Sequence, residues 1–153
     1  LIPVAHKKHM TNNFDYQSVP YGYAHCFNGR CPQSGSCLRH FVAENCTSQY
    51  PTLSIINPNC IPADASCPYF KEVRTYRMAW GIKHLLDKVP YEAADEMRRQ
   101  LIAHFGKNTY YRFYRLERPL RPEDQEFVCR LFQRKGIAEA PRFERYSEEY
   151  YFD

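Results

Sequence analysis

Long apolar runs are missing from this chain of 153 residues. No stretch approaches the roughly 20 apolar residues that a membrane-spanning helix needs, which argues against an integral membrane protein. The first ten residues also lack an apolar core of signal-peptide length. The sequence therefore predicts a cytoplasmic protein without a membrane partner, with Met10 as its native start and residues 1–13 as a disordered extension or tag remnant.

Familiar catalytic motifs are missing as well. The chain contains no phosphate-binding glycine loop, no HExxH and no GxSxG. His84 and His104 fall on expected helices with apolar faces, where a structural histidine is commoner than a catalytic one. We predict no catalytic residue, and an enzyme is not the favoured class.

Charge of one sign is not concentrated anywhere in the chain. The formal net charge is +4, and the basic residues alternate with acidic ones. This pattern indicates mainly a solvated surface and only weak attraction to a polyanionic partner.

Cysteine is present but unevenly distributed. Tight CxxC pairs are absent, and an odd set of seven cysteines in a reducing compartment argues against a full disulfide framework. Cys129 stands alone and is interpreted as a structural or incidental thiol. The other six crowd into one loop-rich segment: Cys26, Cys31, Cys37, Cys46, Cys60 and Cys67. Such a segment holds little apolar material, so convergence of thiolates on a bound ion would help it to fold.

The spacing within this segment suggests which cysteines bind the ion. Cys26, Cys31 and Cys37 are separated by Gly and Pro residues that allow tight loops. Cys67 precedes Pro68 and an expected helix start, where the helix dipole would stabilise a thiolate. We predict Cys26, Cys31, Cys37 and Cys67 as ligands of zinc, with His40, Cys60 and Cys46 as alternates. An iron–sulfur cluster is the alternative cofactor, and unliganded or disulfide-bonded cysteines also stay open.

Composition divides the chain into two parts of one predicted domain, residues 14–153. Residues 14–68 form the loop-rich cysteine segment, with a short helix expected over residues 37–45 and a short strand over 53–56. Residues 69–153 show periodic patterns. They predict helices over 69–88, from Pro90 to Gly106 and over 122–135, and strands over 109–117 and within 142–152. The fold class is therefore α+β, with the cysteine segment packed on about three helices and a small β-sheet.

Aromatic and basic side chains alternate in the strand expected over residues 109–117. Tyr111, Arg112, Phe113 and Arg115 would form a possible surface for nucleic acid or a protein partner. An ordinary strand that buries one aromatic row explains the same pattern. Arg112 and Arg115 are also expected to face two acidic residues of the last strand, Glu148 and Glu149.

Several blocks of sequence carry a family resemblance. They read VPYGYAHCFNGRCPQSGSCLRH, CPYF, AWGIKHLLDKVP, FGKNTYYRFYRLERPLRPEDQ and SEEYYF. The chain resembles, over residues 14–152, an uncharacterised family of small cysteine-containing proteins from gut bacteria. The resemblance implies one compact cytosolic domain starting near Met10. It carries no activity and no metal identity, although an anaerobic source would favour the iron–sulfur alternative.

Taken together, these patterns predict a small zinc-stabilised binding or interaction module. One alternative is an iron–sulfur redox protein or enzyme, and another is a nucleic-acid-binding regulatory protein. The partner is not specified by any motif.

Overall fold

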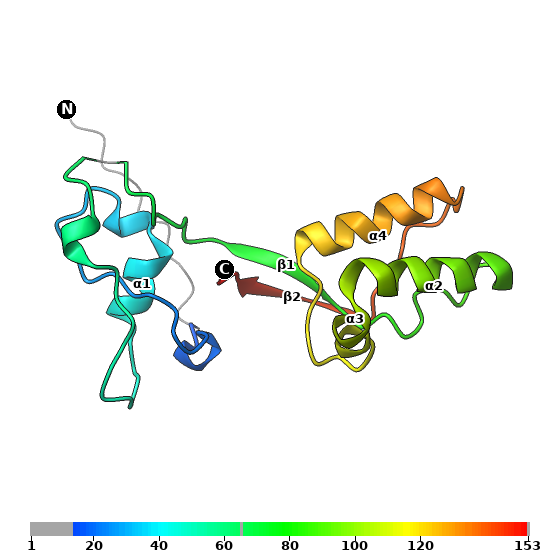
Figure 1. The fold of residues 1–153 in the computed structure, drawn as a ribbon, viewed down its shortest axis with the longest axis horizontal. Helices are drawn as coiled ribbons and strands as arrows, with labels where there is room; N and C mark the ends of the chain where they lie inside the picture. Colours follow the sequence, from blue (N-terminus) through cyan, green and yellow to red (C-terminus); the bar gives the residue numbers. More distant parts are fainter. Residues whose placement is uncertain (1–13, 65, 153) are drawn as a thin grey trace. The chain divides into compact units, whose positions relative to one another are not determined.

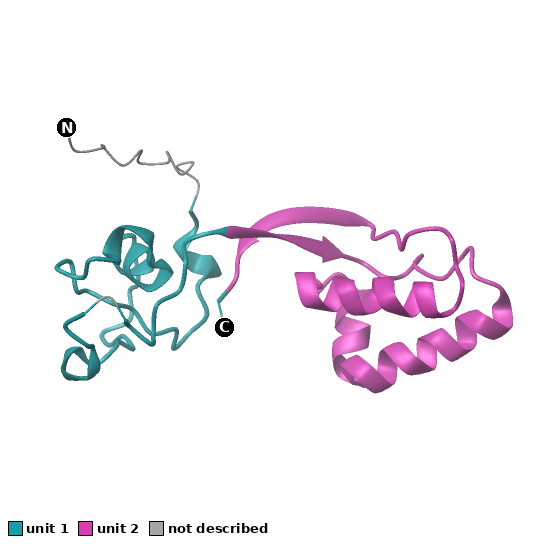
Figure 2. Cartoon of the chain, turned by 90° about the horizontal axis from the view of Figure 1, so that it is seen from above, with its two compact units in different colours: residues 1–74, 152–153 teal, residues 75–151 magenta. Residues whose placement is uncertain are grey.

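A computed structural model describes residues 14–64 and 66–152, and the extension predicted for residues 1–13 lies outside these ranges. The chain divides into two compact units (Figure 2). Unit 1 comprises Leu1–Arg74 with Phe152–Asp153, and unit 2 comprises Thr75–Tyr151. The predicted change of composition after residue 68 lies close to this division. The single domain predicted for residues 14–153 stays a prediction.

The predicted α+β class is confirmed (Figure 1). The described residues hold four α-helices, a two-stranded antiparallel sheet and a loop-rich cysteine segment. No helix in the described ranges has the length and apolar character needed to cross a membrane.

Unit 1 is built mainly from loops. Its regular elements are α1 (Leu38–Glu44) and three short 3₁₀ helices, η1 (Tyr16–Ser18), η2 (Ser34–Ser36) and η3 (Pro58–Cys60). Helix α1 confirms the helix expected over residues 37–45, and it buries Leu38, Val42 and Ala43. The strand expected over residues 53–56 is wrong, because this segment forms only an isolated parallel bridge between Ile55 and His25.

Long-range backbone hydrogen bonds tie the turn around Cys37 to the residues that follow the cysteine segment. The amide of Leu38 donates to the carbonyl of Lys71 at 2.6 Å, and the amide of Val73 donates to Ser36 at 2.9 Å. Between them, Cys37 and Glu72 form an antiparallel bridge. These bonds satisfy backbone groups that a loop-rich segment cannot pair locally.

Unit 2 contains the sheet. Strand β1 (Thr75–Trp80) pairs antiparallel with β2 (Arg145–Tyr150), in a register that places Thr75 opposite Tyr150. Strand β2 confirms the strand expected near the C-terminus. The helix expected over residues 69–88 is wrong, because β1 occupies its centre. Pairing with a segment distant in sequence outweighs the local helical spacing of apolar residues.

Three helices complete unit 2. They are α2 (Tyr91–Phe105), α3 (Lys107–Tyr114) and α4 (Pro122–Arg134). Helices α2 and α4 confirm the helices expected from Pro90 and from Pro122. The strand expected over residues 109–117 is wrong, because α3 covers most of it. Tyr110 and Phe113, three residues apart, lie on one side of α3 and are its buried residues.

The core of unit 2 lies between these helices and β1. Phe113 is 1% exposed and packs edge-to-face against Phe105 at a ring distance of 5.2 Å. The side-chain amide of Gln125 donates to the carbonyls of Arg77 and Leu120, at 2.8 and 2.9 Å. The start of α4 is thereby attached to the backbone of β1.

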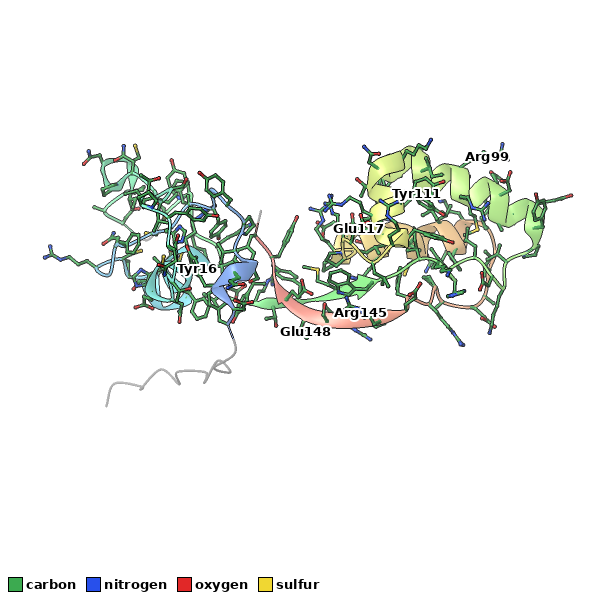
Figure 3. The ribbon with its side chains drawn as sticks, turned by 90° about the horizontal axis from the view of Figure 1, so that it is seen from below. Tyr16, Arg99, Tyr111, Glu117, Arg145 and Glu148 are labelled. Carbon is green, nitrogen blue, oxygen red and sulfur yellow. The ribbon has the colours of Figure 1, made fainter. Side chains whose placement is uncertain are left out.

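The cross-strand ion pairs expected for Arg112 and Arg115 are wrong. Residue Glu148 lies opposite Arg77 in the sheet, and Glu149 lies opposite Tyr76. In Figure 3, Glu148 lies on β2, whereas Glu117 lies just beyond α3. Arg115 instead donates to both carboxylate oxygens of Glu117, at 2.7 and 3.2 Å.

Gly81, which directly follows β1, is a position where a side chain cannot be accommodated. Its φ is +83°, and an added Cβ would lie 2.9 Å from Cβ of Glu144. We expect Gly81→Ala to lower the free energy of unfolding by about 2–4 kcal/mol, because overpacking adds to the cost of the left-handed backbone. Urea denaturation measures the loss.

Gly136→Ala is the matched control for Gly81→Ala. Gly136 has φ +68°, but an added Cβ would meet nothing within 4 Å. This variant should lose only the backbone contribution, about 1–2 kcal/mol. Equal losses in the two variants would show that contact with Glu144 is irrelevant.

Candidate functional site

The four cysteines preferred as metal ligands line one cavity of unit 1. Cys26, Cys31, Cys37 and Cys67 surround a space of about 20 Å³, together with His40. The two alternate cysteines are not among the lining residues. The rest of the lining consists of Asn28, Gln33, Ser34, Arg39, Ile56, Ile61, Tyr69 and Phe70.

Each cysteine reaches the cavity from a different turn. The amide of Cys26 donates to the carbonyl of Arg39 at 3.1 Å, which joins the first turn to α1. Cys31 closes a turn through its amide, which donates to Asn28 at 3.2 Å. Cys37 lies between η2 and α1 and is 8% exposed. The cavity is thus formed by long-range folding rather than by a short sequence motif.

The surroundings of Cys67 differ from the prediction. In the described part of the chain no helix begins at Pro68, so a helix dipole does not act on this thiol. The carbonyl of Cys67 instead accepts a hydrogen bond from the amide of Phe70 at 3.2 Å, which closes a turn. Cys67 lines the cavity because of this turn.

His40 has a polar neighbour at each ring nitrogen. Its Nδ1 lies 2.9 Å from the carbonyl oxygen of Cys26 and therefore donates, since a carbonyl only accepts. Its Nε2 lies 3.4 Å from Oε1 of Glu44. Metal-binding histidines often donate their second N–H to a carbonyl in this way. A ligand role for His40 would require Nε2 to turn away from Glu44.

The described side chains do not form a closed metal site. Among them, no group of three or more His, Cys, Asp or Glu residues is placed to hold a metal ion. No disulfide joins the seven cysteines, all of which fall in the described ranges. Zinc and the iron–sulfur cluster stay predictions.

A buried polar atom also belongs to the cavity wall. Gln33 lines the cavity, and its Oε1 is buried without a hydrogen-bond partner among the described residues. Leaving such an acceptor unpaired costs about 1–3 kcal/mol.

Family comparison covers both units of the chain. A family model described as "Family of unknown function (DUF6078)" matches residues 10–152. The chain belongs to the DUF6078 family. No curated protein and no solved structure matches the chain. The DUF6078 description assigns no activity.

The aromatic and basic surface predicted on residues 109–117 is only partly exposed in this DUF6078 member. Tyr111 is 38% exposed and Arg112 is exposed on α3. Phe113 lies in the core, and Arg115 is paired with Glu117. The nucleic-acid or partner surface of Tyr111, Arg112, Phe113 and Arg115 stays a prediction.

Of the two histidines expected on helices, only His104 lies on one. His84 lies in a turn rather than on a helix, and its Nδ1 is 2.7 Å from Oδ2 of Asp87. His104 stacks on Phe127 with a ring distance of 3.5 Å. No nucleophilic side chain is recorded beside either ring among the described contacts.

Sequence reasoning missed a second polar cluster in unit 1. His25 is 3% exposed, and its Nε2 lies 2.7 Å from the hydroxyl of Tyr16. The available signal was the high tyrosine content, since 13 tyrosines are many for this length. Composition alone cannot distinguish tyrosines that are buried in a core from tyrosines that line a surface cavity.

Proposed function

We propose that this protein is a small metal-binding module in which Cys26, Cys31, Cys37 and Cys67 hold one zinc ion. The ion stabilises the loops of unit 1, and the folded unit then serves as an interaction module. The observation that supports this proposal is that all four cysteines, from four separate turns, line the same cavity.

The size of the cavity favours a single ion over a cluster. A volume of about 20 Å³ is close to that of one water-sized sphere, whereas an iron–sulfur cluster contains several heavy atoms. Zinc bound by four thiolates needs Zn–S distances of about 2.3 Å. Binding therefore requires the side chains to draw inward and the thiols to lose their protons.

The residues that line the cavity include one cation. Zinc with four thiolates carries two net negative charges, and Arg39 is a cation in the lining. Its side chain is held by donation to the carbonyls of Ala24 and Tyr69, at 3.0 and 3.1 Å. A fixed guanidinium stabilises thiolates more effectively than a mobile one.

Elemental analysis of protein purified without oxygen tests the proposal. We expect one zinc per chain and a colourless solution. Bound iron together with visible absorbance would contradict the zinc proposal and support the iron–sulfur alternative. Protein that contains neither metal would contradict both.

Matched cysteine variants locate the ion. Cys37→Ser should lose the metal, because it removes a buried cavity thiol. Cys129→Ser is the control, because Cys129 lies on α4 in unit 2 and should keep full metal content. Equal metal content in the two variants would show that the cavity is not the site.

A further inference from the structure

We propose that unit 1 carries a second site, a hollow of about 680 Å³ that binds a neutral carbohydrate. The hollow is lined by most of residues 16–25 and 47–54, and none of the four predicted zinc ligands lines it. Its volume falls within the range of about 300–1,000 Å³ that is common for small-molecule sites. This inference is independent of the metal proposal.

The lining of the hollow is uncharged. None of its residues is Asp, Glu, Lys or Arg. A phosphate, carboxylate or ammonium ligand would lose hydration there without gaining an ionic partner. The chemistry of the wall therefore selects a neutral ligand.

Hydroxyl and amide groups supply hydrogen bonds of both kinds. A hydroxyl or a carboxamide can donate and accept, as the hydroxyl groups of a sugar also do. The lining includes six such side chains besides the tyrosines: Gln17, Thr47, Ser48, Gln49, Thr52 and Ser54. A polyhydroxylated ligand can satisfy this mixture, whereas an apolar ligand would leave these groups unpaired.

Two exposed tyrosines form an aromatic corner of the hollow. Tyr21 is 87% exposed and Tyr50 is 66% exposed. Their rings meet edge-to-face, with centroids 5.5 Å apart and an interplanar angle of 74°. Large apolar faces left in solvent beside polar groups are typical of binding sites. The C–H face of a pyranose ring is flat and apolar enough to pack on such a ring.

The buried part of the lining has fixed proton positions. Nδ1 of His25 donates to the carbonyl of Ser54 at 3.2 Å, so Nε2 of the neutral ring accepts from the hydroxyl of Tyr16. Burial, with a smaller contribution from Cys46, raises the pKa of Tyr16 to about 12. Tyr16, which makes this hydrogen bond to His25, lies on η1 (Figure 3).

A proline-rich peptide is the competing occupant, since such peptides dock on aromatic grooves. Its backbone offers mainly carbonyl acceptors, which would use the donors of the wall and leave the acceptors unpaired. A sugar uses both. The balance of donors and acceptors therefore favours carbohydrate.

Ligand-detected NMR and calorimetry on the full chain test the proposal. The neutral probes are the hexasaccharides of maltose, cellulose, xylan and mannan type. The comparison probes are an oligogalacturonate and a proline-rich decapeptide. We expect binding of at least one neutral hexasaccharide and none of the oligogalacturonate. Failure of every neutral probe, or tighter binding of either comparison probe, would overturn the assignment.

Tyrosine variants locate the bound sugar. Tyr21→Ala and Tyr50→Ala should each weaken binding by about tenfold or more, the loss typical of a central aromatic contact. Tyr91→Ala is the matched control, because Tyr91 is 86% exposed and lies on α2 in unit 2. Circular dichroism confirms that each variant is folded. Equal affinities in Tyr21→Ala and Tyr91→Ala would also overturn the assignment.

Discussion

Chelation of the zinc that we propose for unit 1 is expected to unfold unit 1 and to leave unit 2 folded. Binding by structural zinc sites contributes an apparent free energy of about 10–16 kcal/mol, which is folding free energy when no site exists in the unfolded chain. Unit 1 has little regular structure among its described residues, because its longest element is α1, which buries three residues. Unit 2 contains a core of its own, drawn from β1 and three helices.

Each unit contains a residue that reports on it separately. Trp80 is the only tryptophan and lies on β1, where its Nε1 donates to the hydroxyl of Ser147 at 2.7 Å. Its fluorescence should not change on chelation. Cys37, which is 8% exposed, should become reactive towards iodoacetamide. The control is Cys129, on α4 in unit 2, whose alkylation rate should stay constant.

A shared transition would contradict this expectation. If chelation changed the emission of Trp80 together with the reactivity of Cys37, the units would unfold as one. If neither signal changed, the metal would contribute nothing to the stability of unit 1.

Phe113→Ala is expected to destabilise unit 2 by about 3–5 kcal/mol, the usual cost of deleting a fully buried aromatic ring. Phe113 is 1% exposed. It contacts Phe105 edge-to-face at 5.2 Å, and the guanidinium of Arg118 lies 5.9 Å from its ring centre. The change would leave a cavity between α2 and α3 and remove an aromatic pair.

Tyr111→Ala is the matched control on the same helix. Tyr111 is 38% exposed, so its removal should change stability by no more than about 0.5 kcal/mol. Thermal and urea unfolding followed by Trp80 fluorescence measure both variants. If both variants lost the same free energy of unfolding, Phe113 would not be the buried residue of α3 and Tyr111 would not be an exposed one.

The helices with strong local signals were predictable from sequence. Helix α2 follows Pro90 and ends before Gly106, which has φ +80°. Helix α4 begins at Pro122, and Asp124 accepts a hydrogen bond from the amide of Arg121. Start and stop signals of this kind act within one turn, so a single sequence reveals them.

The elements around residues 69–88 and 109–117 were not predictable in the same way. Strand β1 has apolar residues at helical spacing, but it exists because β2 pairs with it from the other end of unit 2. Helix α3 is rich in aromatic residues that favour strands, but Tyr110 and Phe113 gain burial only as a helix. In both cases distant contacts outweigh local preference.

By itself, the sequence determined the α+β class, the crowding of cysteine into one loop-rich segment and the ends of the capped helices. Only the tertiary structure decided which cysteines share a cavity, which aromatic residues are buried, and that uncharged side chains surround a hollow near His25. The reason is the range of the forces involved. Caps and turns are satisfied by neighbouring residues, whereas a cavity wall is assembled from separate turns by hydrogen bonds and packing between residues far apart in the chain.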